Sequence, residues 1–285
     1  MPDASLLALA ALNHLAHAPL VAHDLPYGVH LRRHLDLYRP AGSPPFPVLI
    51  FFYGGGWRSG AKELYRFVGA TFAASGFLTV IPDYRIYPEV QFPGFLEDCA
   101  QAVAWVHREA QVWGGDGMPP AVIGHSAGAY NAAMLALDPS WLGEAGLGAR
   151  RDLSAVIGLA GPYDFGPSSG PSLKTIFGPE KEWPRTQPIH YVRGDNPPLL
   201  LIAGSVDRVV LATNTRRLAA RIRAAGGPVE ERIYPWAGHL AVLSALAPTL
   251  RLLAPTHRDC LRFLDRTTVA ARARPHRRKD ADQTV

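Results

Sequence analysis

Cysteine is scarce in this chain, and long apolar runs are absent. Only two cysteines occur among 285 residues; Cys99 falls on an apolar helical face and Cys260 lies beside leucines, so we interpret both as core residues rather than a disulfide pair. No segment approaches the ~20 consecutive apolar residues of a membrane-spanning helix. The apolar stretch 6–12 is short and follows Asp3 rather than a basic run, which is a poor signal peptide. We therefore expect a cytoplasmic protein without a membrane span.

Motifs for metal ions, nucleotides and nucleic acids are missing as well. The chain has no metal-ligand spacing, no P-loop and no G-x-G-x-x-G pattern, so neither a metal nor a cofactor is expected. The net charge of +5 comes mostly from residues 266–285, which hold six Lys/Arg and two Asp. This segment lacks apolar periodicity and predicts a basic, disordered tail. Because the body adds no basic stripe, a nucleic-acid partner is not expected.

What the chain does have is a regular alternation of strands and helices. Apolar residues make up 48% of it, enough for a large core. The expected strands are 31–38, 48–53, 78–82, 121–124, 155–159, 199–204 and 229–234. The expected helices are 61–75, 93–113, 127–137, 213–225 and 240–264, the last of them interrupted near Pro248 and Pro255. This order predicts one α/β domain over residues 24–265, with a mostly parallel sheet and an antiparallel hairpin at its edge.

Two other segments differ from this pattern. Residues 1–23 are expected to contain a helix that packs on the body. Segment 161–198 is rich in Pro, Gly and Ser and too long for a structureless loop, so we expect a small lid-like insertion. Its bulky apolar side chains either line a substrate pocket or anchor the segment to the body. They are Tyr163, Phe165, Ile176, Phe177 and Trp183.

The most specific motif is a serine between two glycines. A short apolar run ends in Gly124, His125, Ser126, Ala127 and Gly128, and a helical run follows. This is the G-x-S-x-G arrangement, in which a serine stands on a sharp turn from strand to helix and side chains two residues away would crowd it. The turn exposes the serine hydroxyl at a helix N-terminus, where partial positive charge favours a developing anion. We predict that Ser126 is the nucleophile.

A glycine-rich turn upstream predicts an oxyanion hole. The apolar run 48–52 opens into Tyr-Gly-Gly-Gly-Trp at 53–57. Glycines allow backbone N–H groups to point into a pocket with no side chain in the way. We assign the donors to Gly55, Gly56 and the N–H of Ala127. The alternative is a flexible turn without a catalytic role.

The other two members of a triad are expected downstream. Asp207 follows a buried strand, and His239 follows another strand in a Gly-His context. The order Ser126, Asp207, His239 is that of α/β-hydrolases, in which histidine takes the serine proton and the carboxylate holds the imidazole tautomer. Asp164 also follows a strand and is the rival for the acid.

With these residues in place, the chain resembles the compact α/β-hydrolase carboxylesterases over roughly residues 24–265. That group includes enzymes like hormone-sensitive lipase, feruloyl and acetyl-xylan esterases, and kynurenine formamidases. The resemblance rests on the motifs above, on Asp-Tyr-Arg at 83–85, on Phe-Pro-Gly-Phe-Leu-Glu-Asp at 92–98 and on Gly-Pro-Tyr-Asp at 161–164. It implies an eight-stranded type of sheet flanked by helices. The family usually has histidine where Tyr53 stands, and His125 replaces the aspartate of the hormone-sensitive-lipase branch.

The sequence thus predicts a serine carboxylesterase that works through an acyl-enzyme on small esters. Trp57, Tyr163 and Leu240 are the candidate substrate-binding residues. One alternative is an arylformamidase acting on N-formylkynurenine, which Gly56 argues against because formamidases of this type carry a bulky residue there. A second is a catalytically silent binding protein, which the intact triad argues against. A homodimer is left open.

Overall fold

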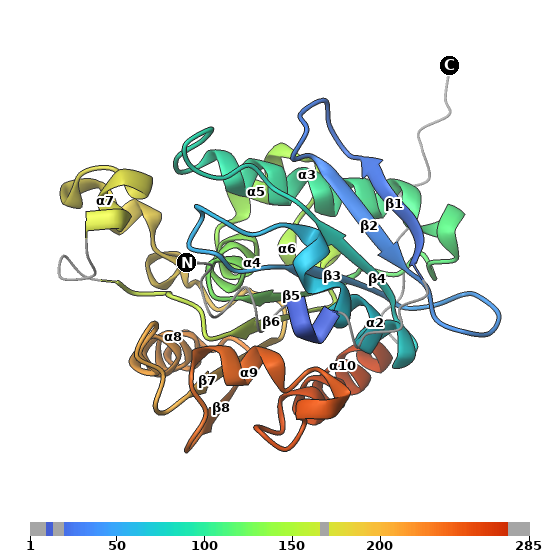
Figure 1. Ribbon diagram of the computed structural model, residues 1–285. Coiled ribbons are helices and arrows are strands. Elements are labelled where there is room, and N and C mark those ends of the chain that lie inside the picture. Colours follow the sequence, from blue (N-terminus) through green and yellow to red (C-terminus); the bar gives the residue numbers. More distant parts are fainter. Residues whose placement is uncertain (1–9, 14–19, 166–170, 273–285) are drawn as a thin grey trace.

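The computed structural model describes residues 10–13, 20–165 and 171–272 (Figure 1). Within them lies one sheet of eight strands in the order β1-β2-β4-β3-β5-β6-β7-β8. The strands are β1 Leu20–Pro26, β2 His34–Tyr38, β3 Val48–Phe52, β4 Leu78–Pro82, β5 Ala121–His125, β6 Ala155–Leu159, β7 Leu199–Gly204 and β8 Val229–Tyr234. Strand β2 pairs antiparallel with both β1 and β4, and every later pair is parallel. The predicted mostly parallel sheet with an antiparallel edge hairpin is confirmed.

Helices cover both faces of this sheet. They are α2 Arg66–Ala74, α3 Gly94–Glu109, α4 Ala127–Leu137, α5 Pro139–Glu144, α6 Ala149–Asp152, α7 Pro171–Phe177, α8 Thr213–Ala224, α9 His239–Ser244 and α10 Thr256–Arg272. In Figure 1, α3, α4 and α8 lie on one side of the sheet, and α2 and α10 lie on the other. This arrangement explains why the central strands β3, β4, β5, β6 and β7 are buried along their whole length and read as continuous apolar runs.

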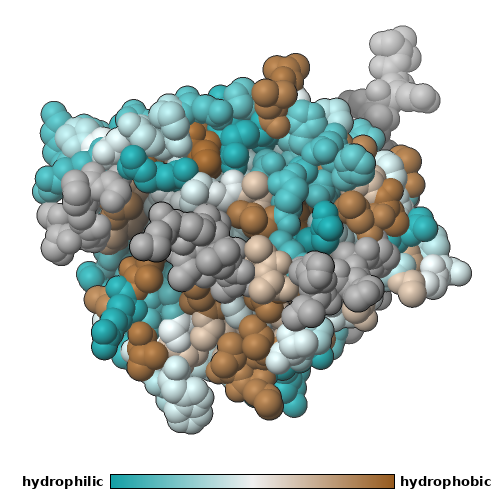
Figure 2. Space-filling model, viewed as in Figure 1, coloured by the Kyte–Doolittle hydropathy of each residue, from teal (hydrophilic) through white to brown (hydrophobic). Residues whose placement is uncertain are grey.

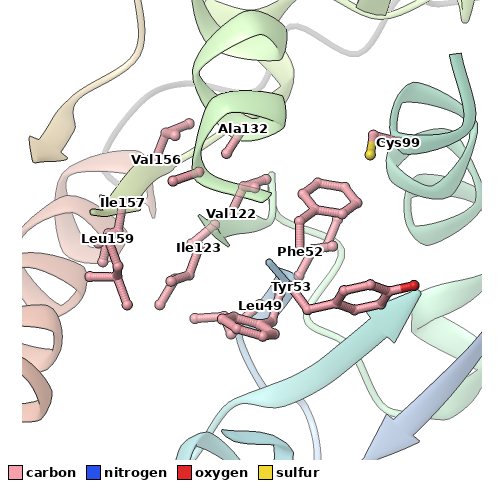
Figure 3. Packing of buried hydrophobic residues seen from close by; sticks show 14 of the residues in the cluster. Leu49, Phe52, Tyr53, Cys99, Val122, Ile123, Ala132, Val156, Ile157 and Leu159 are labelled. Carbon is pink, nitrogen blue, oxygen red and sulfur yellow. The ribbon is translucent and has the colours of Figure 1, made fainter. Parts of the chain in front are cut away.

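The core lies between the central strands and these helices. Figure 3 shows side chains of β3, β5 and β6 packed together, with Ala132 of α4 above them and Cys99 of α3 to one side. Cys99 and Cys260 are both buried and free, as the sequence predicted. A sheet packed on both faces is rigid, and the carboxyl ends of its parallel strands hold the loops at that edge in fixed positions.

Two sequence-based boundaries need correction. Strand β1 begins at Leu20, so the sheet starts inside the segment 1–23 that was expected to be helical. The sequence did not reveal this strand because its residues are only partly buried and alternate irregularly. The predicted helix in 1–23 otherwise falls largely outside the described residues. Helix α10 continues through Arg272, so the predicted tail cannot begin at 266, and residues 273–285 lie outside the described part.

The segment 161–198 contains helix α7 and two 3₁₀ turns, η4 Glu180–Thr186 and η5 Pro188–Tyr191. Its apolar side chains are almost fully buried: Tyr163, Phe165, Ile176, Phe177 and Trp183. Phe177 lies at the centre, with its ring 4.8 Å from that of Trp57 and 5.1 Å from that of Phe165. These aromatics therefore anchor the segment to the body, which is the second of the two interpretations offered above.

Candidate active site

Ser126 stands alone between β5 and α4, on the turn that the sequence predicted. Its φ of 54° and ψ of −119° lie in a region that side-chain-bearing residues rarely adopt. A Cβ at Gly124 would overlap the carbonyl of Gly128, and a Cβ at Gly128 would overlap the carbonyl of Phe52. Both glycines are thus required by close backbone approach. The Ser126 N–H also donates to the carbonyl of Leu159 at 2.8 Å, which ties the turn to β6.

His239 links Ser126 to Asp207 through hydrogen bonds at its two ring nitrogens. Its Nε2 lies 3.0 Å from Ser126 Oγ, and its Nδ1 lies 2.8 Å from Asp207 Oδ2. The other carboxylate oxygen accepts the N–H groups of Val209 at 2.8 Å and Val210 at 2.9 Å. With Nδ1–H donating to the carboxylate, Nε2 is left as the acceptor for the serine hydroxyl. This is the geometry that proton removal from serine requires.

The environment of Asp207 keeps it ionised. Burial alone would raise its pKa, but the hydrogen bond from His239 and the two backbone N–H donors outweigh burial and lower the pKa below its usual value. A carboxylate that stays charged near the imidazole stabilises the imidazolium formed when histidine takes a proton.

The structure distinguishes Asp207 from its rival Asp164. Asp164 pairs with Arg217, whose Nε lies 2.8 Å from Asp164 Oδ2, while its backbone N–H donates to Asn214. Only Asp207 forms the hydrogen bond to His239. Asp164 therefore fixes the loop after β6 to α8.

The predicted oxyanion residues lie beside the serine. A Cβ at Gly54 would come within 3.0 Å of Ser126 Cβ, so this turn packs directly against Ser126. Gly55 and Gly56 have φ of 128° and 59°, which are left-handed values that favour glycine. Among the described residues, the N–H groups of Gly55, Gly56 and Ala127 donate to no backbone oxygen. Unpaired donors beside a nucleophile are what an oxyanion hole needs, and their assignment remains a prediction.

A buried polar network supports this turn, and the sequence revealed only part of it. Tyr53 Oη donates to Asp83 Oδ1 at 2.6 Å and accepts from Arg32 Nη2 at 2.9 Å. The same Arg32 nitrogen donates to the Gly60 carbonyl at 2.8 Å, which closes the turn from its far end. Tyr53 thus joins Asp83 and Arg32 at the start of the glycine turn. Arg32 was missed because an isolated arginine in an early loop carries no motif.

Burial also shifts the ionisation of this network. Burial raises the pKa of Asp83, although hydrogen bonds from Tyr53 and the Lys62 amide act in the opposite direction. Burial, and then the charge of Asp83, raises the pKa of Tyr53 well above its usual value. The phenol therefore stays protonated and donates, and Arg32 supplies the positive charge that faces Asp83.

His125 is a second buried histidine next to the candidate triad. Its Nε2 lies 3.3 Å from the His239 carbonyl, and the two imidazole rings are 4.9 Å apart. Burial, and then the neighbouring His239, lowers the pKa of His125 to about 3. A neutral His125 with Nε2–H can donate to that carbonyl and so position the loop that carries His239.

The three candidate substrate-binding residues differ in exposure. Trp57 is 2% exposed, and its indole Nε1–H donates to Asn131 Oδ1 at 3.0 Å. Tyr163 is fully buried. Neither ring offers surface to a ligand in this conformation, and both pack the core. Leu240 is half-buried at the start of α9, directly after His239. Their substrate-binding role stays a prediction, and Leu240 is the best placed of them.

Two further findings concern the described residues as a set. They contain no group of three or more His, Cys, Asp or Glu side chains that could hold a metal ion. None of their helices is both long enough and apolar enough to cross a membrane.

Comparison with known families connects this geometry to relatives. The model of the BD-FAE family matches residues 35–222, which include β2 through most of α8. The chain belongs to the BD-FAE family. A second model, that of the prolyl oligopeptidase family, matches residues 177–268 and so overlaps the part that carries Asp207 and His239.

Relatives of this BD-FAE protein are named esterases. Esterase LipC of Mycobacterium tuberculosis is 32% identical over 75% of this chain and 58% of its own length. A probable isoprenylcysteine alpha-carbonyl methylesterase of Oryza sativa is 33% identical over 51% of this chain and 35% of its own length. The chain thus spans about half the length of these relatives or less.

Solved structures share the fold of this BD-FAE protein. A truncated carbohydrate esterase from gut microbiota aligns with a TM-score of 0.77 at 20% identity. The alignment covers 89% of this chain and 99% of that structure. An esterase of Thermogutta terrifontis with bound butyrate has a TM-score of 0.68 at 23% identity and covers 89% of this chain and 94% of its own. The molecule has the α/β-hydrolase fold.

Proposed function

We propose that the protein is a serine carboxylesterase that hydrolyses small esters through an acyl-enzyme. The observation that carries this proposal is the chain of hydrogen bonds from Ser126 through His239 to Asp207. Membership of the BD-FAE family and the esterase names of its relatives support it.

In the first step, His239 Nε2 accepts the proton of Ser126 as Oγ attacks the ester carbonyl. The negative charge that forms on the carbonyl oxygen is met by the N–H groups of Gly55, Gly56 and Ala127. The imidazolium then gives its proton to the alcohol as the C–O bond breaks. Water attacks the acyl-enzyme by the same route in reverse and frees the acid and Ser126.

The space around the nucleophile favours a small acyl group. Four aromatic side chains of 161–198 are buried in the core and so offer no surface to a long acyl chain: Tyr163, Phe165, Phe177 and Trp183. A Cβ at Gly56 would meet no atom within 4 Å, so the turn leaves room beside the candidate oxyanion hole. We propose an acyl chain of roughly two to six carbons, with a graded preference because each methylene changes binding by only ~1–3 kcal/mol.

The test compares kcat/KM for p-nitrophenyl acetate, butyrate, hexanoate, octanoate and palmitate, with N-formylkynurenine as the competing amide. Ser126→Ala is the blank, and its kcat is expected to fall by on the order of 10⁶-fold. Intact-mass spectrometry should show one organophosphonate adduct on the wild type and none on Ser126→Ala. A preference for N-formylkynurenine would make the protein a formamidase, and a wild type that neither reacts nor hydrolyses would make it a binding protein.

A further inference from the structure

An exposed apolar patch lies on the two loops that carry Asp207 and His239. Nine large hydrophobic side chains are exposed in the described part of the chain, and four of them belong to these loops. They are Val206 at 54%, Val209 at 73%, Leu211 at 58% and Trp236 at 77% exposure. We call these four residues the rim patch. Exposed apolar side chains are ordinary when scattered, but gathered beside a functional site they mark a contact surface.

Hydrogen bonds join the two loops into one surface. The N–H of Val206 donates to the Ala237 carbonyl at 3.3 Å, and the N–H of Ser205 donates to the Tyr234 carbonyl at 2.9 Å. The hydroxyl of Ser205 also bonds to the carbonyl of Pro235. Val206 and Trp236 therefore belong to neighbouring backbone segments rather than to separate protrusions.

The rim patch is also continuous with the candidate triad. Val206 and Val209 flank Asp207, and the N–H of Val209 donates to its carboxylate. Trp236 lies in the short loop between β8 and α9, and α9 begins at His239. Whatever covers the rim patch is therefore held next to the residues that would do the chemistry.

The shape and charge of the rim patch indicate the kind of partner. Its side chains are more than half exposed, so they project from the surface and no single small ester could cover them all. A broad apolar surface can cover all four side chains at once. Tryptophan in particular favours the boundary between an apolar phase and water. Arg208 is exposed between Asp207 and Val209 and forms no ion pair among the described residues, so it adds attraction to an anionic surface.

We propose that the rim patch docks the enzyme on the surface of an aggregated ester, such as an emulsion droplet or a vesicle that carries the ester in its outer layer. This inference rests on the proposed function and names the physical state of its substrate. Docking raises the local ester concentration at Ser126 and leaves the triad unchanged. It should therefore increase the rate of hydrolysis of aggregated esters and not that of dissolved esters.

The kinetic test uses one short-chain ester in two states. Tributyrin is titrated from below to above its solubility limit, with p-nitrophenyl acetate as a dissolved reference. The variant Leu211→Ser/Trp236→Ser removes the two patch side chains that do not flank Asp207. Its control is Val112→Ser/Leu252→Ser, which removes two side chains exposed by 80% and 100% elsewhere. The patch variant is expected to lose on the order of ten-fold in rate on emulsified tributyrin. Its hydrolysis of p-nitrophenyl acetate is expected to stay near the wild-type value.

A binding test needs no catalysis and therefore separates the two proposals. Ser126→Ala is floated with vesicles of phosphatidylcholine alone and of phosphatidylcholine with phosphatidylglycerol. Binding should increase with the anionic lipid, fall when Arg208→Gln is added, and be lost when the two patch substitutions are added. If these vesicles are bound but no ester is cleaved by the wild type, the proposed function fails and the docking surface stands.

Three results would overturn the docking proposal. The first is equal loss of emulsion activity in the patch variant and its control. The second is equal loss on dissolved and emulsified ester, which would place the patch side chains in the site itself. The third is a dimer in solution that dissociates in the patch variant, which would show that a second copy covers the rim patch.

Discussion

The elbow around Ser126 and the glycine turn at 54–56 touch each other, yet different forces hold them. The elbow is fixed by backbone packing: a Cβ at Gly124 would overlap the carbonyl of Gly128, and a Cβ at Gly128 would overlap the carbonyl of Phe52. The glycine turn is supported by a buried polar network, in which Tyr53 bonds to Asp83 and Arg32, and Arg32 bonds to the carbonyl of Gly60 beyond the turn. Steric contact between backbones is difficult to loosen, whereas a polar network fails when one partner is removed.

This difference suggests a division of labour. The nucleophile needs one fixed position, and a strained turn between a buried strand and a helix supplies it. The proposed oxyanion donors must also point in the correct direction, and a network with several partners can adjust that direction. The two regions should therefore respond differently to substitution. A change in the proposed triad should remove a proton-transfer group, whereas a change near the glycine turn should only misdirect its N–H donors.

The largest effect is expected at the acid of the triad. Asp207→Asn leaves the size of the side chain unchanged, but the amide holds the imidazole of His239 in the wrong tautomer. The value of kcat should therefore fall by about 10⁴-fold. Steady-state hydrolysis of p-nitrophenyl acetate measures it. Asp164→Asn is the matched control and should keep most of the activity, because Asp164 pairs with Arg217 and not with His239. A reversed result would transfer the acid role to Asp164.

The next effect separates two adjacent glycines of the turn. A Cβ at Gly55 would overlap the Ser59 carbonyl, whereas a Cβ at Gly56 would meet nothing within 4 Å. Gly55→Ala should displace the donors and lower kcat by at least ~10²-fold. Gly56→Ala carries only the ~1–2 kcal/mol cost of a left-handed alanine and should stay closer to the wild type. Circular dichroism verifies that both variants are folded, and equal kcat values would show that the turn does not depend on this contact.

A smaller effect tests the polar network directly. Tyr53→Phe leaves Asp83 and Arg32 without their shared partner, so the free energy of unfolding should drop by about 1–3 kcal/mol. The value of kcat should decrease more than KM changes, because the turn loses its orientation. Urea denaturation and steady-state kinetics measure the two quantities. Tyr191→Phe, whose hydroxyl bonds only to the Arg185 carbonyl at the surface, is the control and should remain within about 0.5 kcal/mol of the wild type. An unchanged Tyr53→Phe would remove the distinction between the two regions.

The smallest effect concerns His125, which lies where the two regions meet. A Cβ at Gly54 would be 3.0 Å from its Nδ1, and its Nε2 faces the His239 carbonyl. The unfolded chain takes up a proton at this histidine as pH falls through 6.5, but the folded protein resists until about 3. The unfolded state thus binds more protons in this window, and stability falls as pH decreases.

Urea titrations between pH 7 and pH 4 measure this slope, with wild type and His125→Gln compared side by side. The variant should lose less stability on acidification because it has no buried imidazole at this position. His257, whose pKa burial lowers to about 4, leaves a remaining slope in both proteins. Parallel slopes would mean that His125 is protonated in the folded state.

The sequence-based expectations were accurate for buried elements and less accurate at the edge of the sheet and at the chain end. The sequence predicted β4, β6, β7 and β8 with their observed bounds, and helix α4 as well, because each is a clear periodic or apolar run. It missed β1, whose partly buried edge position produces no such pattern. It also placed the start of the tail too early, because residues 266–272 of α10 have the polar, basic composition of a disordered segment.

At the site, Gly124, Ser126 and Gly128 could be identified from sequence because their spacing records a local steric requirement. Tertiary structure alone decided between Asp207 and Asp164, since both follow strands and only the direction of the loops brings one of them to His239. Only the tertiary structure brings Arg32 to the hydroxyl of Tyr53, 21 residues away in the sequence. It likewise brings His125 to the carbonyl of His239, 114 residues away. It also buried Trp57 and Tyr163 and exposed Trp236. The physical reason is that local backbone geometry is encoded in neighbouring residues, whereas side-chain partners and exposure depend on how distant segments pack.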